Sequence, residues 1–311
     1  MDDIFRISRR RVLGQFATIG AMLMSSPRIS AGATAEAIAR RAIPRSGEAV
    51  PVIGLGTWQT FDVGTAQSAR APLREVLARF VEAGGTVVDS SPMYGRAEAV
   101  VGDIAADLGI QARLFYATKV WTRGQKEGVR QMEESFRRLR VQRMDLMQIH
   151  NLLDLKTHTE TLLKWKQEGR VRYIGITHYS AGAHAELERL VRTKAYDFVQ
   201  INYSLGEREA EQRLLPAAQE AGVAVLINRP FGSGGLFRRV RRDPVPDWAT
   251  EIGCASWAQI FLKWIVSHPA VTCVIPATSN PQHLVDNMAA GRGPQPDARM
   301  RQRMAEAFDR L

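Results

Sequence analysis

Eight short apolar runs, separated by segments with helical periodicity, constrain the fold of this chain more than any other feature. The runs are rich in Val, Ile and Leu and show no polar–apolar alternation, which is typical of parallel strands buried on both faces. Between them, segments such as 71–83 place their apolar residues on one face of a helix. Eight strands alternating with helices predict an α/β fold, a closed (β/α)8 or TIM barrel, rather than an open doubly wound sheet. The eight runs cover residues 51–57, 86–90, 114–120, 145–150, 171–177, 198–203, 224–229 and 271–276.

The Gly54-Leu55-Gly56 sequence does not open a dinucleotide-binding Rossmann unit. That fingerprint needs a third glycine at the position of Gln59 and a helix that begins there, and no helical pattern begins at Gln59. The 311 residues have room for one barrel, since roughly 250 residues are typical of the fold. We therefore expect a single domain over residues 36–311.

Residues 1–35 have the organisation of an export signal. A pair of arginines within Ser8–Leu13, similar to the twin-arginine (Tat) motif, precedes a moderately apolar stretch and an A-x-A pattern that ends at Ala35. The stretch is too short and too weakly apolar to indicate a membrane span. We expect a twin-arginine signal peptide, recognition by the twin-arginine export machinery, and a periplasmic mature protein without stable membrane insertion. A basic tail on a cytoplasmic protein is the alternative.

Charge and cysteine content exclude several kinds of partner. The formal net charge is +10, but the basic residues are scattered, and the dense run from Arg238 to Arg242 has no interleaved aromatic residues. We expect no nucleic-acid binding; a basic surface suits an anionic substrate or cofactor equally well. Cys254 and Cys273 predict two separate thiols, and two thiols alone make no zinc site, so no metal is expected.

Four reactive side chains fall near the ends of three successive predicted strands. Asp89, Lys119 and His150 lie at the ends of the second, third and fourth strands, and Tyr94 lies on the loop after Asp89. In a parallel barrel the active site lies at these carboxyl ends. Singly, the four residues could be a turn cap, a surface lysine, a core histidine and a loop tyrosine; together they predict a catalytic site.

The chemistry that this set predicts is proton donation by a tyrosine. A free tyrosine has a pKa of about 10 and is a weak acid near neutrality, but an ammonium within about 4–6 Å stabilises the phenolate and lowers that pKa. Asp89 would keep Lys119 charged, and His150 would hydrogen-bond the substrate oxygen. Tyr94 would then protonate a carbonyl oxygen as a hydride reaches the carbon.

These four residues resemble the catalytic tetrad of the aldo-keto reductases, and the resemblance extends from about Ile43 to Asn287. Residues 52–58 are similar to the family's first barrel strand, 164–176 to the segment entering the fifth strand, and 274–281 to the last strand and its adenosine-phosphate loop. The resemblance implies an NAD(P)H-dependent oxidoreductase that reversibly reduces an aldehyde or ketone, a small-molecule carbonyl substrate, to an alcohol.

The family pattern also implies which residues bind the cofactor. Positions along the barrel rim would contact the nicotinamide carboxamide, a glycine-rich loop over 232–236 would cover the pyrophosphate, and a helix near the end of the chain would contact the adenine. A solvated helix face is the alternative for this last pair, Asp286 and Asn287. The residues implied are Thr57, Thr177, His178, Gln200, Arg229, Phe231, Ser233, Thr278, Asp286 and Asn287.

Several positions depart from the family pattern. Asn228 stands where an aromatic ring often stacks on the nicotinamide, and Asn151 stands where many members have tryptophan. Ala277 and His283 occupy positions where NADPH-preferring members often have a basic residue. The resemblance therefore favours NADP(H) on family grounds and leaves NAD(H) possible.

Trp58 and Trp121 are expected to form walls of an apolar substrate pocket, with core packing as the alternative. Two further functions stay open. An NADP(H)-binding accessory or sensor protein with little turnover would not need Tyr94. A Schiff-base enzyme would use Lys119 as its nucleophile, although pairing with Asp89 would keep that lysine charged.

Overall fold

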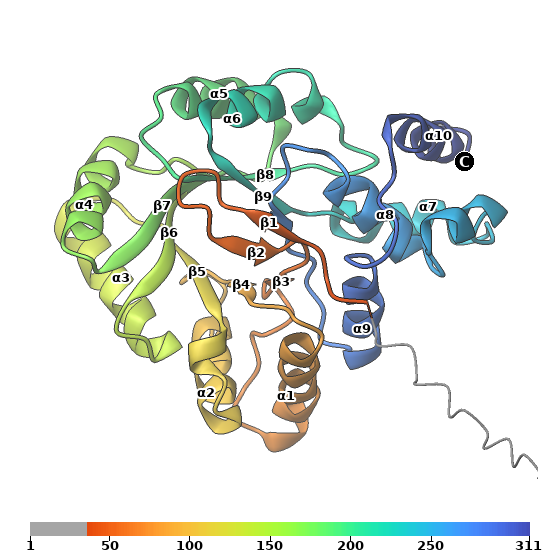
Figure 1. The fold of residues 1–311 in the computed structure, drawn as a ribbon. Helices are drawn as coiled ribbons and strands as arrows, with labels where there is room; N and C mark the ends of the chain where they lie inside the picture. The colour runs from red at the N-terminus through yellow and green to blue at the C-terminus, as the bar shows by residue number, and fades with distance from the viewer. Residues whose placement is uncertain (1–35) are drawn as a thin grey trace, which may run out of the picture. The chain divides into compact units, whose positions relative to one another are not determined.

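A parallel eight-stranded sheet forms the centre of the described chain, residues 36–311 of a computed structural model (Figure 1). The twin-arginine signal expected over 1–35 lies outside the described residues. Neighbouring strands follow the order of the sequence, so every connection leads to the next strand of the sheet. The strands are β3 (Leu55–Gly56), β4 (Val87–Asp89), β5 (Phe115–Val120), β6 (Met144–His150), β7 (Val171–Thr177), β8 (Phe198–Asn202), β9 (Ala224–Asn228) and β10 (Cys273–Val274).

The sheet closes between its first and last strands. Parallel bridges join Ile53 to Val274 and Gly56 to Ala277, and the Gly54 amide donates to the Val274 carbonyl at 2.8 Å. A Cβ on Gly54 or Gly56 would lie 2.9 Å or 2.8 Å from a backbone oxygen, which is too close for any other residue. These two glycines therefore serve the barrel seam, and the predicted closed barrel is confirmed.

A helix packs outside the barrel after each strand (Figure 1). The first begins four residues before the predicted segment 71–83 and buries the predicted apolar face, including Leu73, Val76 and Phe80. The helices that follow the strands are α1 (Gln67–Glu82), α2 (Ala97–Leu108), α3 (Gln125–Leu139), α4 (Leu155–Gln167), α5 (His184–Arg192), α6 (Leu214–Ala221), α8 (Trp257–Val266) and α9 (Pro281–Ala289).

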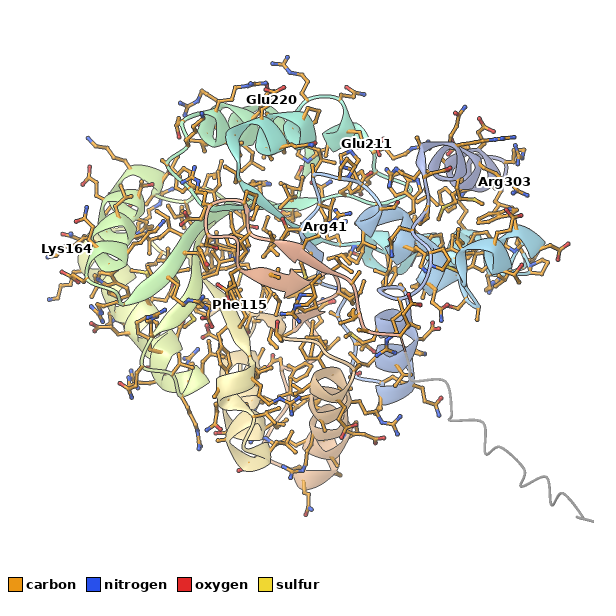
Figure 2. The ribbon with its side chains drawn as sticks, in the orientation of Figure 1. Arg41, Phe115, Lys164, Glu211, Glu220 and Arg303 are labelled. Atoms are coloured by element: carbon orange, nitrogen blue, oxygen red, sulfur yellow. The ribbon has the colours of Figure 1, made fainter. Side chains whose placement is uncertain are left out.

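An antiparallel hairpin, β1 (Arg40–Ala42) and β2 (Ala49–Pro51), lies across the ring of strands (Figure 1). Ile43 and Val50 from the hairpin join a buried cluster with residues of the barrel interior such as Phe115, which Figure 2 labels. The hairpin thus fills one end of the barrel and leaves the other end, with the carboxyl termini of the strands, for the site. This hairpin was not predicted from the sequence, because three-residue strands are too short to show a periodic pattern.

Two further α-helices are α7 (Gly235–Arg239), in the excursion between β9 and α8, and α10 (Ala298–Asp309). Cys254 and Cys273 are both buried and free, which confirms two separate thiols. Within residues 36–311 no helix has the length and apolarity needed to cross a membrane.

Candidate active site

Lys119 and Asp89 form an ion pair inside the barrel. The Lys119 Nζ donates to Asp89 Oδ2 at 2.6 Å and to the Ser90 carbonyl at 2.7 Å, and the lysine side chain is fully buried. Burial alone would lower the pKa of Lys119, but the interactions with Asp89 and Tyr94 together outweigh burial, and the pKa is raised. The lysine is therefore a fixed cation, which argues against its use as a Schiff-base nucleophile.

The second oxygen of Asp89 is held by two glutamines. Gln200 Nε2 donates to Asp89 Oδ1 at 2.8 Å and Gln148 Nε2 donates to it at 3.1 Å. The carboxylate is thus hydrogen-bonded on both oxygens, as a buried anion requires. Gln148 was missed in the sequence analysis. It lies two residues before His150 on the same strand, so the alternation of side chains along a strand could have placed it inside the barrel.

Tyr94 lies against the ion pair and against His150. Lys119 Nζ is 5.0 Å from the centre of the tyrosine ring, and the Tyr94 and His150 rings meet edge to face at 6.2 Å. The expectation that Tyr94 has a lowered pKa is wrong. Burial raises its pKa, Lys119 lowers it, and Asp89 raises it again, with a raised pKa as the net result. Tyr94 therefore keeps its proton at neutral pH.

His150 is a neutral ring. Burial and the Lys119 charge lower its pKa to about 3. Its Nδ1 lies 3.3 Å from Ser91 Oγ. If the serine hydroxyl donates to Nδ1, the tautomer carries its hydrogen on Nε2, where it can be donated to a ligand.

A cavity of about 780 Å³ lies at the carboxyl ends of the strands. It brings together most of the residues predicted for the site, although Lys119 lies behind Asp89 and does not reach the cavity surface. The predicted residues that line it are Thr57, Trp58, Asp89, Tyr94, Trp121, His150, Thr177, Gln200, Arg229, Phe231 and Ser233.

Four predicted cofactor residues do not line this cavity. His178 lies just outside it, with its ring stacked on Tyr179. Thr278 and Asn287 are buried, and the Asp286 carboxylate accepts hydrogen bonds from Ser256 and Gln259 at 2.7 and 2.6 Å. The alternative of a solvated helix face does not hold for Asn287, which is 4% exposed.

Apolar side chains stand around the cavity mouth. Trp58 is 46% exposed, Trp121 39% and Met93 41%, and all three line the cavity. The two tryptophans are therefore not core residues, which excludes the packing alternative. Trp121 also lies 6.0 Å from the His150 ring, measured between ring centres.

A model of the aldo/keto reductase family matches residues 52–305 of this chain. The chain belongs to the aldo/keto reductase family.

Individual relatives in the family agree with the fold and with the length of the described domain. Methylglyoxal reductase YeaE of Escherichia coli (strain K12) is 29% identical over 247 residues, which cover 77% of this chain and 85% of that protein. A crystal structure of an aldo/keto reductase from Klebsiella pneumoniae in complex with NADP and acetate is 28% identical, with a TM-score of 0.69 over 84% of this chain and 93% of that one. Another aldo-keto reductase structure from Klebsiella pneumoniae, in complex with NADPH, is 27% identical, with a TM-score of 0.72 over 88% of this chain and 96% of that one.

Unpartnered polar atoms also line the cavity of this family member. Asn228 Oδ1, Arg229 Nε and Asn151 Oδ1 are buried and have no hydrogen-bond partner within the described residues. Buried polar atoms are nearly always satisfied, so these atoms can bind water or a polar ligand in the cavity. Gly232 to Gly234, which begin three residues after Arg229, all have positive φ values, and within this loop the Gly232 and Gly234 N–H groups donate to the Arg229 and Phe231 carbonyls at 2.9 and 3.0 Å.

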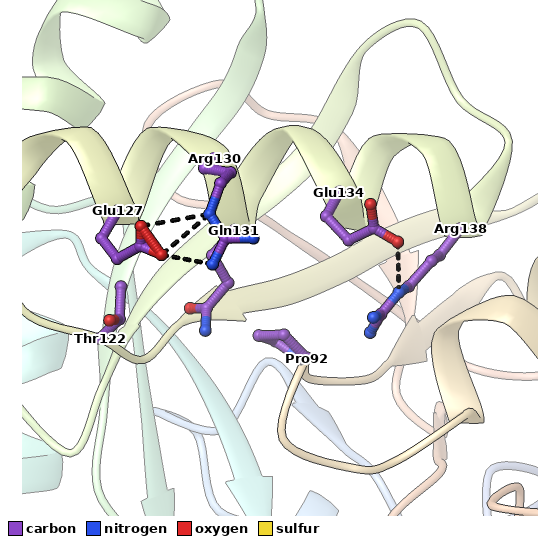
Figure 3. Close-up of a pocket in the computed structure, with 7 residues that line it drawn as sticks. All are labelled: Pro92, Thr122, Glu127, Arg130, Gln131, Glu134 and Arg138. Atoms are coloured by element: carbon purple, nitrogen blue, oxygen red, sulfur yellow. Dashed lines mark hydrogen bonds and ion pairs between the residues drawn. The ribbon is translucent and has the colours of Figure 1, made fainter.

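A smaller cavity of about 170 Å³ lies between α3 and the loop residues Pro92 and Thr122 (Figure 3). Its charged side chains neutralise one another: Glu127 pairs with Arg130, and Glu134 pairs with Arg138 (Figure 3). It therefore offers a ligand no free charge, and the larger cavity is the candidate active site.

Proposed function

We propose that this protein reduces the carbonyl group of a small aldehyde or ketone to an alcohol, reversibly, with NADPH as cofactor and Tyr94 as proton donor. The observation that carries the proposal is the Tyr94 ring, which lies between a fully buried Lys119–Asp89 pair and an open cavity with apolar walls. The family relationship, the methylglyoxal reductase relative and the NADP- and NADPH-bound relatives support the same reaction.

Each residue of the site has its own role in this reaction. The cofactor supplies the hydride that reaches the carbonyl carbon. Tyr94 holds its proton until the carbonyl oxygen takes it, and the Lys119 charge stabilises the tyrosinate that is left. Neutral His150 donates a hydrogen bond to the same oxygen and orients it. Asp89, held by Gln148 and Gln200, keeps the ammonium in place.

The lining residues fit a nicotinamide dinucleotide. Thr177 and Gln200 both line the cavity, where the Thr177 hydroxyl donates to Gln200 Oε1 at 3.2 Å, and their side-chain oxygens can accept from a carboxamide NH₂ group. The unpartnered Arg229 Nε fits its diphosphate. The remaining predicted cofactor contacts, Asp286 and Asn287 among them, stay predictions.

Tyr94→Phe tests the mechanism. Because general acid catalysis contributes about 10²–10⁴-fold, turnover should fall by at least about a hundredfold. The measurement is loss of NADPH absorbance with methylglyoxal and a series of aromatic aldehydes, and the affinity for NADPH should not change. If the native chain binds NADPH and no carbonyl compound oxidises it, the accessory or sensor function replaces this one.

We also propose that residues 1–35 are a twin-arginine signal and residues 36–311 the catalytic domain. The twin-arginine pathway carries folded proteins, so a chain that retains its cofactor could load it before export to the periplasm. Replacing Arg9 and Arg10 with lysine should leave the protein in the cytoplasm, as cell fractionation would show. Periplasmic protein that releases no nucleotide on denaturation would contradict loading before export.

A further inference from the structure

A four-residue loop, 121–124, joins β5 to α3 and carries Trp121. The Trp121 ring lines the active-site cavity and lies 6.0 Å from the His150 ring, measured between ring centres. More than a third of this side chain is exposed, so close packing of the kind found in a protein interior fixes it only in part. The position of the ring in the cavity therefore also depends on how the loop holds the Trp121 backbone.

The side chain of Gln131, from α3, pairs with the Trp121 backbone on both sides of the Trp121 Cα. Gln131 Oε1 accepts from the Trp121 N–H at 2.6 Å, and Gln131 Nε2 donates to the Trp121 carbonyl at 3.2 Å. These two backbone groups belong to the two peptide planes that flank the Cα. One carboxamide thus holds both planes and, with them, the direction of the Cα–Cβ bond. Gln131 itself lines the smaller cavity (Figure 3).

Two side chains from the start of α4 hold the rest of the loop. His158 Nε2 lies 2.7 Å from the Thr122 carbonyl and donates to it, because a carbonyl oxygen only accepts. Asp154, directly before α4, accepts from the Gly124 N–H at 2.7 Å. Water could satisfy the backbone groups of a surface loop equally well. What the side chains add is a fixed shape for the loop.

Gly128 of α3 makes room for His158 beside the loop. A Cβ at Gly128 would lie 2.4 Å from His158 Cε1, which is too close for any other residue. Glycine is unfavourable inside a helix, and a polar imidazole is rarely buried completely, yet α3 contains this glycine and His158 is fully buried. The contact between α3 and α4 at this point therefore supports the loop that carries Trp121.

We propose that Gln131 is a positioning residue that holds the Trp121 ring in place for substrates with an aromatic ring. Gln131 acts through the backbone of Trp121 rather than by contact with the substrate, while His158 and Asp154 support the same loop. The inference rests on the proposed function, because it needs a carbonyl substrate in the cavity. It assigns part of the substrate preference of the site to α3, outside the cavity wall.

Steady-state kinetics with NADPH, benzaldehyde and methylglyoxal test this role. Gln131→Ala should raise the KM for benzaldehyde about two- to tenfold, the range that corresponds to the loss of one aromatic contact. The kcat for both substrates should not change, and neither should the KM for methylglyoxal, which has no ring. A rise in KM at constant kcat is the mark of lost substrate binding rather than of a damaged catalytic step.

Gln131→Met distinguishes hydrogen bonding from packing. Methionine fills a similar volume, but it cannot donate a hydrogen bond and accepts only weakly. The KM for benzaldehyde should therefore rise as much in Gln131→Met as in Gln131→Ala. A native KM for benzaldehyde in Gln131→Met would overturn the proposal, because packing would then hold the loop.

A double-mutant cycle with Trp121→Ala separates positioning of the ring from any other effect of Gln131. Trp121→Ala alone should raise the KM for benzaldehyde to a similar extent. In the double variant Gln131→Ala should add no further rise, because the ring that it positions is absent. Rises that multiply in the double variant would overturn the proposal, since Gln131 would then act on the cavity independently of Trp121.

A matched control is available on α10. Gln302 is an exposed glutamine whose Nε2 donates to Glu306 at 2.8 Å. Gln302→Ala should leave the KM for both aldehydes unchanged, and a rise equal to that in Gln131→Ala would contradict a specific role for Gln131. Unchanged kcat with methylglyoxal would verify that each Gln131 variant is folded.

The outcomes separate the positioning role from the proposed function. A native chain that binds NADPH and reduces no carbonyl compound would overturn the proposed function. Reduction of both aldehydes with an unchanged KM for benzaldehyde in Gln131→Ala would overturn the positioning role alone. An equal rise in both KM values would assign Gln131 to general support of the cavity. A native chain that reduces methylglyoxal but no benzaldehyde would have no aromatic preference to set, so these last two outcomes also overturn the positioning role.

Discussion

Lys119 and Asp89 hold each other at 2.6 Å inside the barrel, with neither side chain more than 4% exposed. Each charge is almost fully removed from water and depends on the other, while the Ser90 carbonyl accepts from Lys119 and two glutamine amides donate to Asp89. The pair therefore places a permanent positive charge 5.0 Å from the Tyr94 ring centre. This arrangement fits the proposed role in catalysis, and it makes the centre of the barrel sensitive to the loss of either partner.

Asp89→Asn should destabilise the protein strongly. Breaking a buried ion pair leaves one uncompensated charge and costs about 3–5 kcal/mol. The measurement is the free energy of unfolding from denaturant titration. Glu75→Gln is the control, because Glu75 pairs with Arg79 at the same 2.6 Å while both side chains are more than 40% exposed. That exposed pair should contribute at most about 1 kcal/mol. Equal losses in the two variants would contradict the prediction.

The pH dependence of the reaction should differ between its two directions. Reduction needs protonated Tyr94, and burial raises the pKa of Tyr94 above its ordinary value of 10.0. The kcat/KM for carbonyl reduction should therefore stay level through neutral pH and fall only above about pH 10. Alcohol oxidation needs the tyrosinate and should rise over the same interval. A reduction profile with a midpoint between pH 7 and 8 would show that another group donates the proton.

The barrel could be predicted because each strand and helix carries its own local pattern, and the strand-end rule alone brings Asp89, Lys119 and His150 together. The hairpin over Arg40–Pro51 could not be predicted, because its strands are only three residues long. The raised pKa of Tyr94 also escaped prediction. Whether this pKa rises or falls depends on whether the effect of burial or that of the Lys119 charge is stronger, and a sequence does not give the depth of burial.

Contacts between side chains that are distant in the sequence could not be predicted either. Gln148 reaches Asp89 across 59 positions of sequence, and Tyr179 meets Arg229 only because the barrel brings the ends of β7 and β9 together. Spacing along the chain identifies which strand ends are neighbours. It does not identify which side chains contact one another beyond the strand ends, so these contacts can be read only from the structure.

Trp121→Ala should change the preference among substrates. The ring lines the cavity beside His150 and is available to pack against an aromatic substrate. Loss of an aromatic contact of about 0.5–1.5 kcal/mol should raise the KM for aromatic aldehydes about two- to tenfold. Methylglyoxal is small and has no ring, so its KM should change little, and kcat should be retained for both. Steady-state kinetics with the two substrates would measure this, and an equal rise in both KM values would indicate general damage to the cavity.

His268 should make the protein less stable in mild acid. Burial and the nearby Arg301 charge lower its pKa to about 4, whereas an unfolded histidine has a pKa of about 6.5. Between pH 6.5 and 4 the unfolded chain binds a proton at His268 more readily than the folded chain does. The free energy of unfolding therefore decreases as the pH falls from about 6.5 toward 4. His268→Gln removes this titration and should lose less unfolding free energy than the native chain between pH 7.5 and pH 5. Denaturant titrations at the two pH values give the comparison. Equal losses of unfolding free energy in the two proteins would show that His268 takes up no proton on unfolding. The acid sensitivity would then come from other groups, such as His150, whose pKa is lowered to about 3.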